Sequence, residues 1–384
     1  MADPTRLRCE RLFDGDSFLD DATVTIANGR IERVESGAGD AGEAEVLGSG
    51  TLAPGFIDLQ VNGGGGVLFN NDPSGSALKR MIDAHRRGGT TSFLPTLISD
   101  SPKVQRKGVA AVSKMIAANE HGLLGIHLEG PHLDRGRRGV HREEFVRPIG
   151  DDDLEWLAEV AGAMTVIVTL APEHVPPHEI EALADAGVIV CAGHTNAGYK
   201  VASDAAAHGL RGFTHLYNAM SQLGSREPGV VGAALDLDDC WCGIIVDGHH
   251  VSAPSVRIAH RAKPAGKLYL VSDAMATAGT SATSYELYGE VVEVVDGCLR
   301  DRDGRIAGST IRLIDAVRVS HLEVGLALEE CLRMASLYPA EFIGSADRLG
   351  RIREGYRADL VLFDADFAVQ GAWVAGERVV DRQA

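Results

Sequence analysis

From residue 54 onward, short β-rich apolar runs alternate with longer segments of helical periodicity, several of which are closed by glycine. The runs expected to form strands lie at residues 55–61, 91–98, 123–129, 164–170, 187–193, 211–216, 242–247 and 267–273. Eight strand-plus-crossover units in succession predict an α/β fold, a closed (β/α)8 TIM-like barrel. A doubly wound open sheet is the alternative arrangement for such a pattern.

The two ends of the chain follow a different pattern. Residues near both termini alternate between apolar and polar between turn signals, and Asn28-Gly29 is a strong hairpin turn. We therefore expect a small β-sandwich domain built from both termini, residues 1–53 and 346–384, beside a barrel over residues 54–345. A further hairpin or meander is expected at 286–308, after the eighth strand.

Charge and hydropathy narrow the functional classes. The chain has 384 residues, of which 45% are hydrophobic, and a formal net charge of −17. This charge argues against nucleic acid and acidic membrane surfaces as partners, although a few local arginines and histidines can hold a small anion. No apolar run is long enough to cross a bilayer, and the charged N-terminus does not resemble a signal peptide, so we expect a cytoplasmic protein. Six scattered cysteines are expected to be reduced core thiols: Cys9, Cys191, Cys240, Cys242, Cys298 and Cys331.

Polar residues gather where the predicted strands end. They are Asp58, Gln60, Glu129, His194, His215, Asp247, His249, His250 and Asp273. The carboxyl ends of barrel strands meet at one face, where the active site of such a barrel lies. There Glu129, His194 and His215 can form a three-ligand catalytic zinc site that leaves a position for water. Asp273, from the eighth strand, can then act as general base on that water.

Other polar residues have simpler explanations. His127 lies on the same strand face as Glu129, where it can orient that carboxylate without binding metal. His132 fits a loop residue without a chemical role. The four-glycine run at 63–66 resembles a phosphate-binding loop but lacks the Lys-Ser/Thr of a P-loop, and a flexible loop at the barrel mouth explains it equally well. Seven further histidines are expected to be structural: His85, His121, His174, His178, His208, His260 and His321.

Seven motifs together resemble a known family. They are GFIDLQVNGGGG, GIHLEGPHL, AGHTNA, FTHLYNAMSQL, REPGVVGAAL, DGHHV and VSDAM. They occur in the order expected of N-acetylglucosamine-6-phosphate deacetylases, which belong to the amidohydrolase superfamily. The likeness begins near residue 52 and extends to the C-terminus, where GYRADLVLFD is similar to the usual closing stretch of the superfamily.

The resemblance implies a barrel with a small β-domain and a reaction in amino-sugar metabolism. That reaction is the hydrolysis of N-acetyl-D-glucosamine 6-phosphate to D-glucosamine 6-phosphate and acetate. By the same resemblance Glu129, His194 and His215 would bind a divalent metal, expected to be Zn²⁺. Asp273 would take a proton from the water and later deliver one to the leaving amine, which departs only when it is protonated.

The resemblance also implies five substrate contacts. His141 would contact the acetamido carbonyl or the sugar. Asn218, Ala219, Arg226 and His250 would also contact the substrate, and Arg226 is best suited to the phosphate, because a guanidinium fork fits phosphate geometry. Family members are commonly homodimers in which the neighbouring subunit helps to complete the phosphate site, so a homodimer is expected here.

One position departs from the wider superfamily. Many amidohydrolases carry a His-x-His pair at the end of the first strand, which binds a second metal, whereas this chain has Asp58-Leu59-Gln60 there. Glutamine is a poor zinc ligand, and a lone aspartate does not retain a second ion unaided. We therefore expect one essential metal per subunit and a second site that is weak or absent.

Three alternative functions remain open. A deacetylase of a related N-acetylhexosamine 6-phosphate, such as the galacto epimer, is the nearest, because backbone groups or water can distinguish the epimeric hydroxyl. A cyclic amidohydrolase is disfavoured, because those enzymes often use a bridging carboxylated lysine and the fourth strand contains none. A catalytically silent relative that kept the barrel as a binding module should have lost ligands or base, and this chain retains all four.

Overall fold

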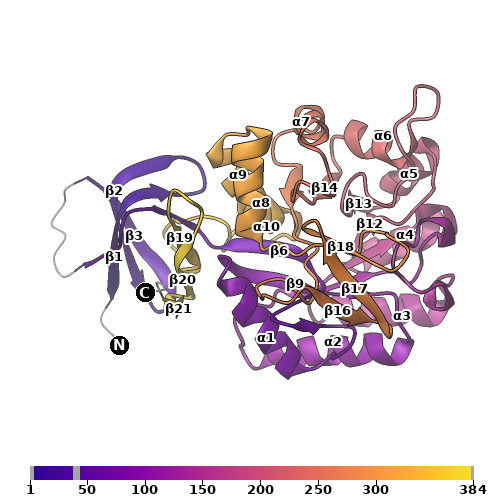
Figure 1. Cartoon of the computed structure of the whole chain (residues 1–384), viewed down its shortest axis with the longest axis horizontal. Helices are drawn as coiled ribbons and strands as arrows, with labels where there is room; N and C mark the ends of the chain where they lie inside the picture. Colours follow the sequence, from indigo (N-terminus) through magenta and orange to yellow (C-terminus); the bar gives the residue numbers. More distant parts are fainter. Residues whose placement is uncertain (1–3, 38–43, 382–384) are drawn as a thin grey trace.

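The computed structural model describes residues 4–37 and 44–381, and a barrel of parallel strands forms the larger part of them (Figure 1). Its strands are hydrogen-bonded in sequence order. They are β6 (Phe56–Val61), β9 (Thr90–Ile98), β10 (Gly125–Glu129), β11 (Thr165–Leu170), β12 (Ile189–Ala192), β13 (Leu210–Phe213), β14 (Trp241–Ile244) and β15 (Leu268–Leu270). Most are buried along their whole length, as parallel strands covered on both faces are. The predicted (β/α)8 fold is confirmed.

The barrel closes between its first and last strands. The N–H of Asp273, three residues beyond β15, donates to the carbonyl of Gln60 at 3.0 Å, and the N–H of Asn62 donates to the carbonyl of Ala274 at 2.9 Å. The side chain of Asp58 adds a bond, since its Oδ1 accepts the N–H of Ser272 at 3.2 Å. These bonds join the two edges that an open sheet would leave free.

Amphipathic helices form the crossovers outside the barrel. They are α1 (Gly75–Arg86), α2 (Pro102–Ala117), α3 (Asp151–Ala161), α4 (Pro177–Asp185), α5 (Tyr199–Ala207), α6 (Gly229–Asp236) and α7 (Ala253–Ala262). Local sequence explains where they begin: the hydroxyl of Ser74 caps α1 by accepting the N–H of Ala77, and Ser101 followed by Pro102 begins α2. Among residues 4–37 and 44–381, no helix has both the length and the apolar character that crossing a membrane requires.

Three more helices follow the eighth strand. They are α8 (Leu313–Val319), α9 (Leu328–Ala335) and α10 (Leu337–Phe342), and a π-helical turn, η4 (Ser320–Val324), follows α8 directly. Both α9 and α10 contact β6 and β15, so they cover the closing edges of the barrel. In Figure 1 these helices lie between the barrel and a small β-domain.

Strands from both ends of the chain form that small domain. They are β1 (Thr5–Phe13), β2 (Phe18–Ala27), β3 (Arg30–Ser36), β4 (Glu45–Val46), β5 (Thr51–Pro54), β19 (Leu360–Phe363), β20 (Val369–Val374) and β21 (Glu377–Val380). All belong to one sheet, and side chains from both of its halves, such as Val24 and Trp373, pack into one cluster. The sheet therefore folds over its own core, and its halves stay joined through β1 and β5. A β-domain formed by both termini is confirmed; residues 1–3, 38–43 and 382–384 lie outside the described part.

Two small sheets complete the barrel mouth. β16 (Ser284–Leu287), β17 (Glu290–Val295) and β18 (Cys298–Arg300) form the expected meander, and β7 (Gly63–Gly64) pairs with β8 (Val67–Leu68) in a hairpin. The expectation of a flexible loop at the four-glycine run is wrong. The imidazole Nε2–H of His85 donates to the carbonyl of Gly63 at 2.8 Å, and a Cβ on Gly63 would lie 2.4 Å from the carbonyl oxygen of Val67. Close backbone packing is the physical reason for glycine here.

Candidate active site

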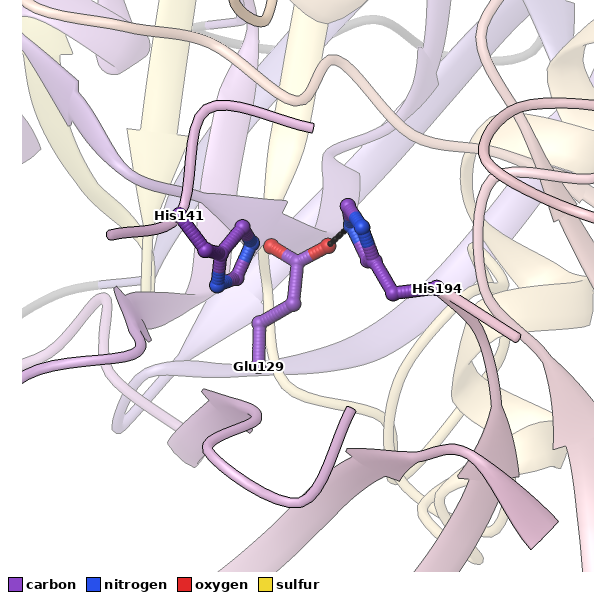
Figure 2. Close-up of side chains that lie close together, drawn as sticks. All are labelled: Glu129, His141 and His194. Carbon is purple, nitrogen blue, oxygen red and sulfur yellow. Dashed lines mark hydrogen bonds and ion pairs between the residues drawn. The ribbon is translucent and has the colours of Figure 1, made fainter. Parts of the chain in front are cut away.

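Three side chains from different barrel strands meet at one point. Glu129 ends β10, His194 lies two residues beyond β12, and His215 lies two residues beyond β13. Oε1 of Glu129 is 3.0 Å from Nε2 of His194 and 2.9 Å from Nε2 of His215, and the two Nε2 atoms are 3.0 Å apart. All three residues are buried. Figure 2 shows the Glu129 carboxylate between the rings of His194 and His141.

The donor set fits a divalent cation. The Nδ1–H of His194 donates to the backbone carbonyl of Arg137 at 2.8 Å, which leaves its Nε2 lone pair directed at Glu129. Two imidazole nitrogens and a carboxylate oxygen are typical ligands of a catalytic zinc centre. Burial would raise the pKa of Glu129, but the adjoining imidazoles of His194 and His215 hold that pKa well below its ordinary value. The Nδ1 atom of His215 has no partner among the described protein atoms.

Asp273 lies beside this group with one carboxylate oxygen held. The side-chain amides of Asn62 and Gln60 donate to its Oδ1 at 2.6 and 3.2 Å, and the Gln60 amide also donates to Oε2 of Glu129 at 3.3 Å. Burial and the nearby charge of Glu129 raise the pKa of Asp273 to about 8. Within residues 4–37 and 44–381 no donor is bonded to Oδ2, and Asp273 lines the cavity above the site. A carboxylate with a raised pKa can both accept and return a proton near neutral pH.

His141 is oriented by the end of the second barrel strand. The backbone N–H of Ser99 donates to Nδ1 of His141 at 3.2 Å, so that nitrogen is an acceptor and the proton of the neutral ring resides on Nε2. Burial lowers the pKa of His141 to about 3, which keeps the ring neutral. One ring nitrogen lies within 4.8 Å of ligand atoms of Glu129 and His194. His141 therefore presents an N–H donor beside the three-residue group.

The backbone at this site adopts rare conformations. The φ angles of His194, His215, Ala219 and Asp273 are 49°, 37°, 50° and 50°, in the left-handed region that non-glycine residues seldom occupy. Three of these residues follow a barrel strand directly or within three residues, so a sharp turn aims each side chain inward. Strained residues of this kind cluster at functional sites, where the surrounding structure holds them in place.

A cavity of 430 Å³ opens above the group, and it brings most of the expected substrate residues together. Asn218, Ala219 and His250 line it with His141. His250 is held by Asp247, whose Oδ2 lies 2.7 Å from its Nδ1. Burial raises the pKa of Asp247, but bonds from His250 and from backbone N–H groups lower it overall, to about 2. Arg226 is not brought to this cavity: it is exposed, on the loop before α6.

Four other sequence expectations have clear outcomes. His127 does not orient Glu129; its Nδ1–H donates to the carbonyl of Leu59 at 3.0 Å, and its Nε2 lies 2.7 Å from the hydroxyl of Thr169. Nδ1 of His132 lies 3.2 Å from the carbonyl of Arg147, as expected of a structural residue. Asp58 is fully buried and accepts backbone N–H groups, and it does not line the cavity. All six cysteines are free and buried.

Sequence reasoning missed several residues that shape the site. Asn62 continues the alternation of Asp58 and Gln60 along the first strand, and this period of two was the available signal. The positive charge of the cavity wall was also missed: Arg135, Arg137, Arg138 and Arg305 all line it. Three of these occur together in the run RGRRG, which marks a cationic loop even without a structure.

Comparison with known proteins identifies the family of this chain. Residues 51–379 match the Amidohydrolase family. The chain belongs to that family. As an amidohydrolase it is a hydrolase, and its Glu129, His141 and His194 form a group that could hold a metal ion. The confirmed resemblance accounts for both the barrel and the terminal β-domain.

Two curated amidohydrolases illustrate its relatives. The chain is 44% identical over 332 residues to the N-acetylgalactosamine-6-phosphate deacetylase of Shewanella sp. (strain ANA-3), covering 86% of this chain and 84% of that protein. It is 38% identical over 329 residues to the N-acetylglucosamine-6-phosphate deacetylase of Haemophilus influenzae, covering 85% and 86%.

Solved structures show the same architecture. N-acetylglucosamine-6-phosphate deacetylase from Pasteurella multocida superposes with a TM-score of 0.94 at 36% identity, covering 98% of this chain and 99% of that one. The Mycobacterium smegmatis enzyme, solved as an aspartate-to-alanine mutant with N-acetyl-D-glucosamine 6-phosphate, superposes with a TM-score of 0.92 at 32% identity, covering 99% and 100%.

Proposed function

We propose that this amidohydrolase hydrolyses the acetamide of N-acetyl-D-glucosamine 6-phosphate to D-glucosamine 6-phosphate and acetate. One observation carries the proposal: Glu129, His194, His215 and Asp273 converge at the base of a single cavity at the carboxyl ends of the barrel strands. The deacetylase names of the relatives supply the substrate class. Such a reaction belongs to amino-sugar metabolism, and the expected location is the cytoplasm.

One divalent ion, Zn²⁺, would be held by Glu129, His194 and His215. When bound, it supplies a Lewis acid that polarises the amide carbonyl and lowers the pKa of water. The first-strand position supports a single ion, because the Gln60 amide is already committed to the carboxylates of Glu129 and Asp273. An amide N–H directed at both carboxylates orients them, and this nitrogen has no lone pair to offer a second ion.

Asp273 would move the protons of the reaction. Because Asn62 and Gln60 hold Oδ1, the free Oδ2 would accept a proton from the attacking water and return it to the nitrogen of the departing amine. The Nε2–H of His141 would donate to the acetamido oxygen, where negative charge develops in the transition state. The ring can serve this role while neutral, because the contact of Nδ1 with the Ser99 N–H leaves the ring proton on Nε2.

Substrate recognition would involve the wall of the cavity and a second subunit. Asn218, Ala219 and His250 would contact the sugar phosphate. Arg226 lies outside this cavity, so it would reach a phosphate only in a homodimer, across the interface. The small β-domain, assigned to residues 1–53 and 346–384, would support the barrel, assigned to 54–345, without contributing to the chemistry.

The alternative substrate is N-acetylgalactosamine 6-phosphate. Relatives named for this epimer are 44% and 32% identical to the chain, and curated relatives named for the gluco epimer fall between these values, for example at 33% and 39%. Overall identity therefore does not separate the two epimers, and the assay must include both.

Acetate release from metal-loaded protein tests the proposed function. We expect rapid release from N-acetylglucosamine 6-phosphate and little from N-acetylglucosamine without the phosphate. Faster release from the galacto epimer would replace the proposed substrate with the alternative. Absence of release from all three sugars, with one metal bound per chain, would contradict the deacetylase assignment.

A further inference from the structure

His194 enters the three-residue group from a turn beyond the end of its strand. Strand β12 ends at Ala192, and the φ angle of His194 is 49°, in the left-handed region. A residue in that region persists there only when its surroundings hold it. The direction of this imidazole therefore depends on the contacts of the residues that surround the turn.

The two residues that follow His194 are both held by Glu173. Oε1 of Glu173 accepts the backbone N–H of Asn196 at 2.6 Å, and Oε2 accepts the hydroxyl of Thr195. Glu173 lies in the short turn η3 (Pro172–His174), which follows β11, so it approaches from the neighbouring barrel strand. Hydrogen bonds to an ionised carboxylate are stronger than those between neutral groups. One side chain thus fixes both residues directly beyond a proposed metal ligand.

His174, the next residue of η3, supports the same turn from its other side. Its Nε2 lies 2.9 Å from Oδ2 of Asp134, and the backbone N–H of Asp134 donates to the carbonyl of His194 at 2.9 Å. The turn η3 is itself anchored, since the N–H of Ala171 donates to the carbonyl of His132 at 2.8 Å. Two consecutive residues after β11 therefore hold the His194 turn at both of its ends.

Asn196 extends this support to the imidazole ring. Its Oδ1 accepts the Nε–H of Arg137 at 3.2 Å, and the carbonyl of Arg137 accepts the Nδ1–H of His194 at 2.8 Å. A partner on one ring nitrogen fixes the orientation of the ring and leaves the lone pair of the other nitrogen for a metal. Glu173 is thus connected through Asn196 to the ring of His194 as well as to its backbone.

A second metal centre is the other explanation for this cluster, because ligand atoms of Asp134, Glu173 and His174 lie within 4.8 Å of one another. The contacts favour support over metal binding. Both oxygens of Glu173 already accept hydrogen bonds, and Oδ2 of Asp134 already contacts His174. An ion at this place would have to compete with these contacts, and the exposed His174 would leave it open to water.

We propose that Glu173 is a positioning residue of the active site: it holds the turn that directs the imidazole of His194 at the metal. The inference rests on the proposed function, which makes His194 a ligand, and it extends that function to the fourth barrel strand, which supplies no ligand. Glu173 lies outside the set of residues that line the cavity, so it acts through Thr195 and Asn196. Its removal should change how tightly, and in what geometry, the ion is held.

Glu173→Ala tests the proposal, with Glu173→Gln as the conservative variant and Asp364→Ala as the matched control. Asp364 also fixes a turn, since its Oδ1 accepts the N–H groups of Asp366 and Ala368 at 3.0 and 2.9 Å, but it lies beyond β19 in the small β-domain. Competition with a chelator measures the Zn²⁺ affinity of each protein. Glu173→Ala should bind Zn²⁺ about 10- to 100-fold more weakly than wild type. Glu173→Gln should lie between them, because its amide oxygen can still accept the Asn196 N–H, and Asp364→Ala should bind as wild type.

Co²⁺ in place of Zn²⁺ gives a readout that a general loss of stability does not move. The visible absorption of this ion depends on the number and arrangement of its ligands. At saturating Co²⁺ the bands of Glu173→Ala should differ from those of wild type, and the bands of Asp364→Ala should not. With the same metal saturation, kcat for N-acetylglucosamine 6-phosphate should fall at least about 10-fold in Glu173→Ala, while KM changes by less than about 2-fold.

Wild-type Zn²⁺ affinity and an unchanged Co²⁺ spectrum in Glu173→Ala would overturn the proposal, even for a variant of lower stability. Equal losses of affinity in Glu173→Ala and Asp364→Ala would overturn it too, because both would then reflect general destabilisation. If Glu173→Ala does not fold, Glu173→Gln takes its place, and wild-type affinity and spectrum in that variant would overturn the proposal.

Two results with wild type separate this inference from its neighbours. A second bound ion that is lost in Glu173→Ala would overturn the positioning role in favour of a metal centre formed with Asp134 and His174. A wild-type protein that bound no ion would overturn the proposed function together with this inference, whereas the results for the variants overturn this inference alone.

Discussion

The chemistry of the site depends on individual residues held in conformations that cost energy. Asp273 shows this most clearly: its φ is 50°, its carboxylate is buried, and two amides fix one of its oxygens. Left-handed backbone costs a non-glycine residue of order 1–3 kcal/mol, which the surrounding bonds must offset. The barrel-closing bond from Asp273 N–H to Gln60 is one of them. The same residues thus hold both the backbone and the side chain of the proposed base.

Replacing Asp273 with asparagine should abolish turnover and little else. The asparagine Oδ1 can still accept from Asn62 and Gln60, so the site keeps its shape, but the side chain can no longer accept a proton. We expect kcat to fall by at least about 100-fold while the chain still binds metal and substrate, measured by steady-state kinetics with metal analysis. A kcat within a few-fold of wild type would remove Asp273 from the role of base.

Among the elements, the glycine hairpin β7–β8 shows how tightly the barrel mouth is packed. Gly63 donates its N–H to the carbonyl of Ala274, next to Asp273, while its own carbonyl accepts from His85 in α1. The hairpin therefore joins α1 to the segment that carries the proposed base. A run of four glycines permits this close approach because no Cβ intervenes.

Gly63→Ala should destabilise the protein strongly, because the new Cβ would lie 2.4 Å from the carbonyl oxygen of Val67 and 2.9 Å from the backbone nitrogen of Ala276. Neither backbone atom can move without disturbing the hairpin, and we expect a loss of more than about 2 kcal/mol in the free energy of unfolding. Gly75→Ala is the control, since its Cβ would meet only the flexible Met115 side chain, with Sδ at 3.6 Å. Urea unfolding that gave equal stabilities for the two variants would contradict this account of the hairpin.

The elements themselves were largely predictable from sequence, because their signals are local. The eight strands were expected within a few residues of their observed bounds, and Asn28-Gly29 forms the turn between β2 and β3 with φ angles of 51° and 74°. The glycine run was misjudged because its partners, such as His85 and Ala276, come from other parts of the chain. No local pattern reveals a contact of that kind.

The site was also predictable in part, because the positions of its main residues at strand ends are a local signal. Glu129, His194, His215 and Asp273 follow strands, so the barrel hypothesis alone places them on one face. Contacts that depend on loop geometry were not predictable: Ser99 orienting His141 and Asn196 supporting Arg137 involve backbone atoms or side chains with no sequence signature. Strand alternation assigns His127 to Glu129, but its ring contacts Leu59 of β6 and Thr169 of β11 instead.

At the scale of the whole molecule, several histidines are buried with neutral imidazole rings. Burial lowers the pKa values of His85, His127 and His132 to about 4 each. In the unfolded chain a histidine has a pKa near 6.5. Between about pH 6.5 and pH 4 these three histidines are therefore protonated in the unfolded chain but remain neutral in the folded one. The free energy of unfolding therefore keeps its full value above about pH 6.5, and it falls as the pH drops from 6.5 toward 4.

His85→Gln tests this acid sensitivity away from the active site. The glutamine amide can still donate to the carbonyl of Gly63 but cannot be protonated. Between pH 7 and pH 5 wild type should lose about 2 kcal/mol more unfolding free energy than the variant does, because one proton-binding group has been removed from the unfolded chain. Chemical denaturation at the two pH values measures the difference; parallel losses in both proteins would refute the assignment of His85 as neutral in the folded state.

The closing seam between β6 and β15 has a consequence for how an active molecule comes into being. Asn62 and Asp273 are more than two hundred positions apart, and the bonds that shut the barrel are the same ones that set the proposed base beside its partners. During synthesis on a ribosome, a nascent chain that lacks its eighth strand has neither a finished cylinder nor a working centre. Catalysis therefore appears in one step, at the end of assembly, and enzymatic rate becomes a gauge of how many molecules in a preparation have folded to completion.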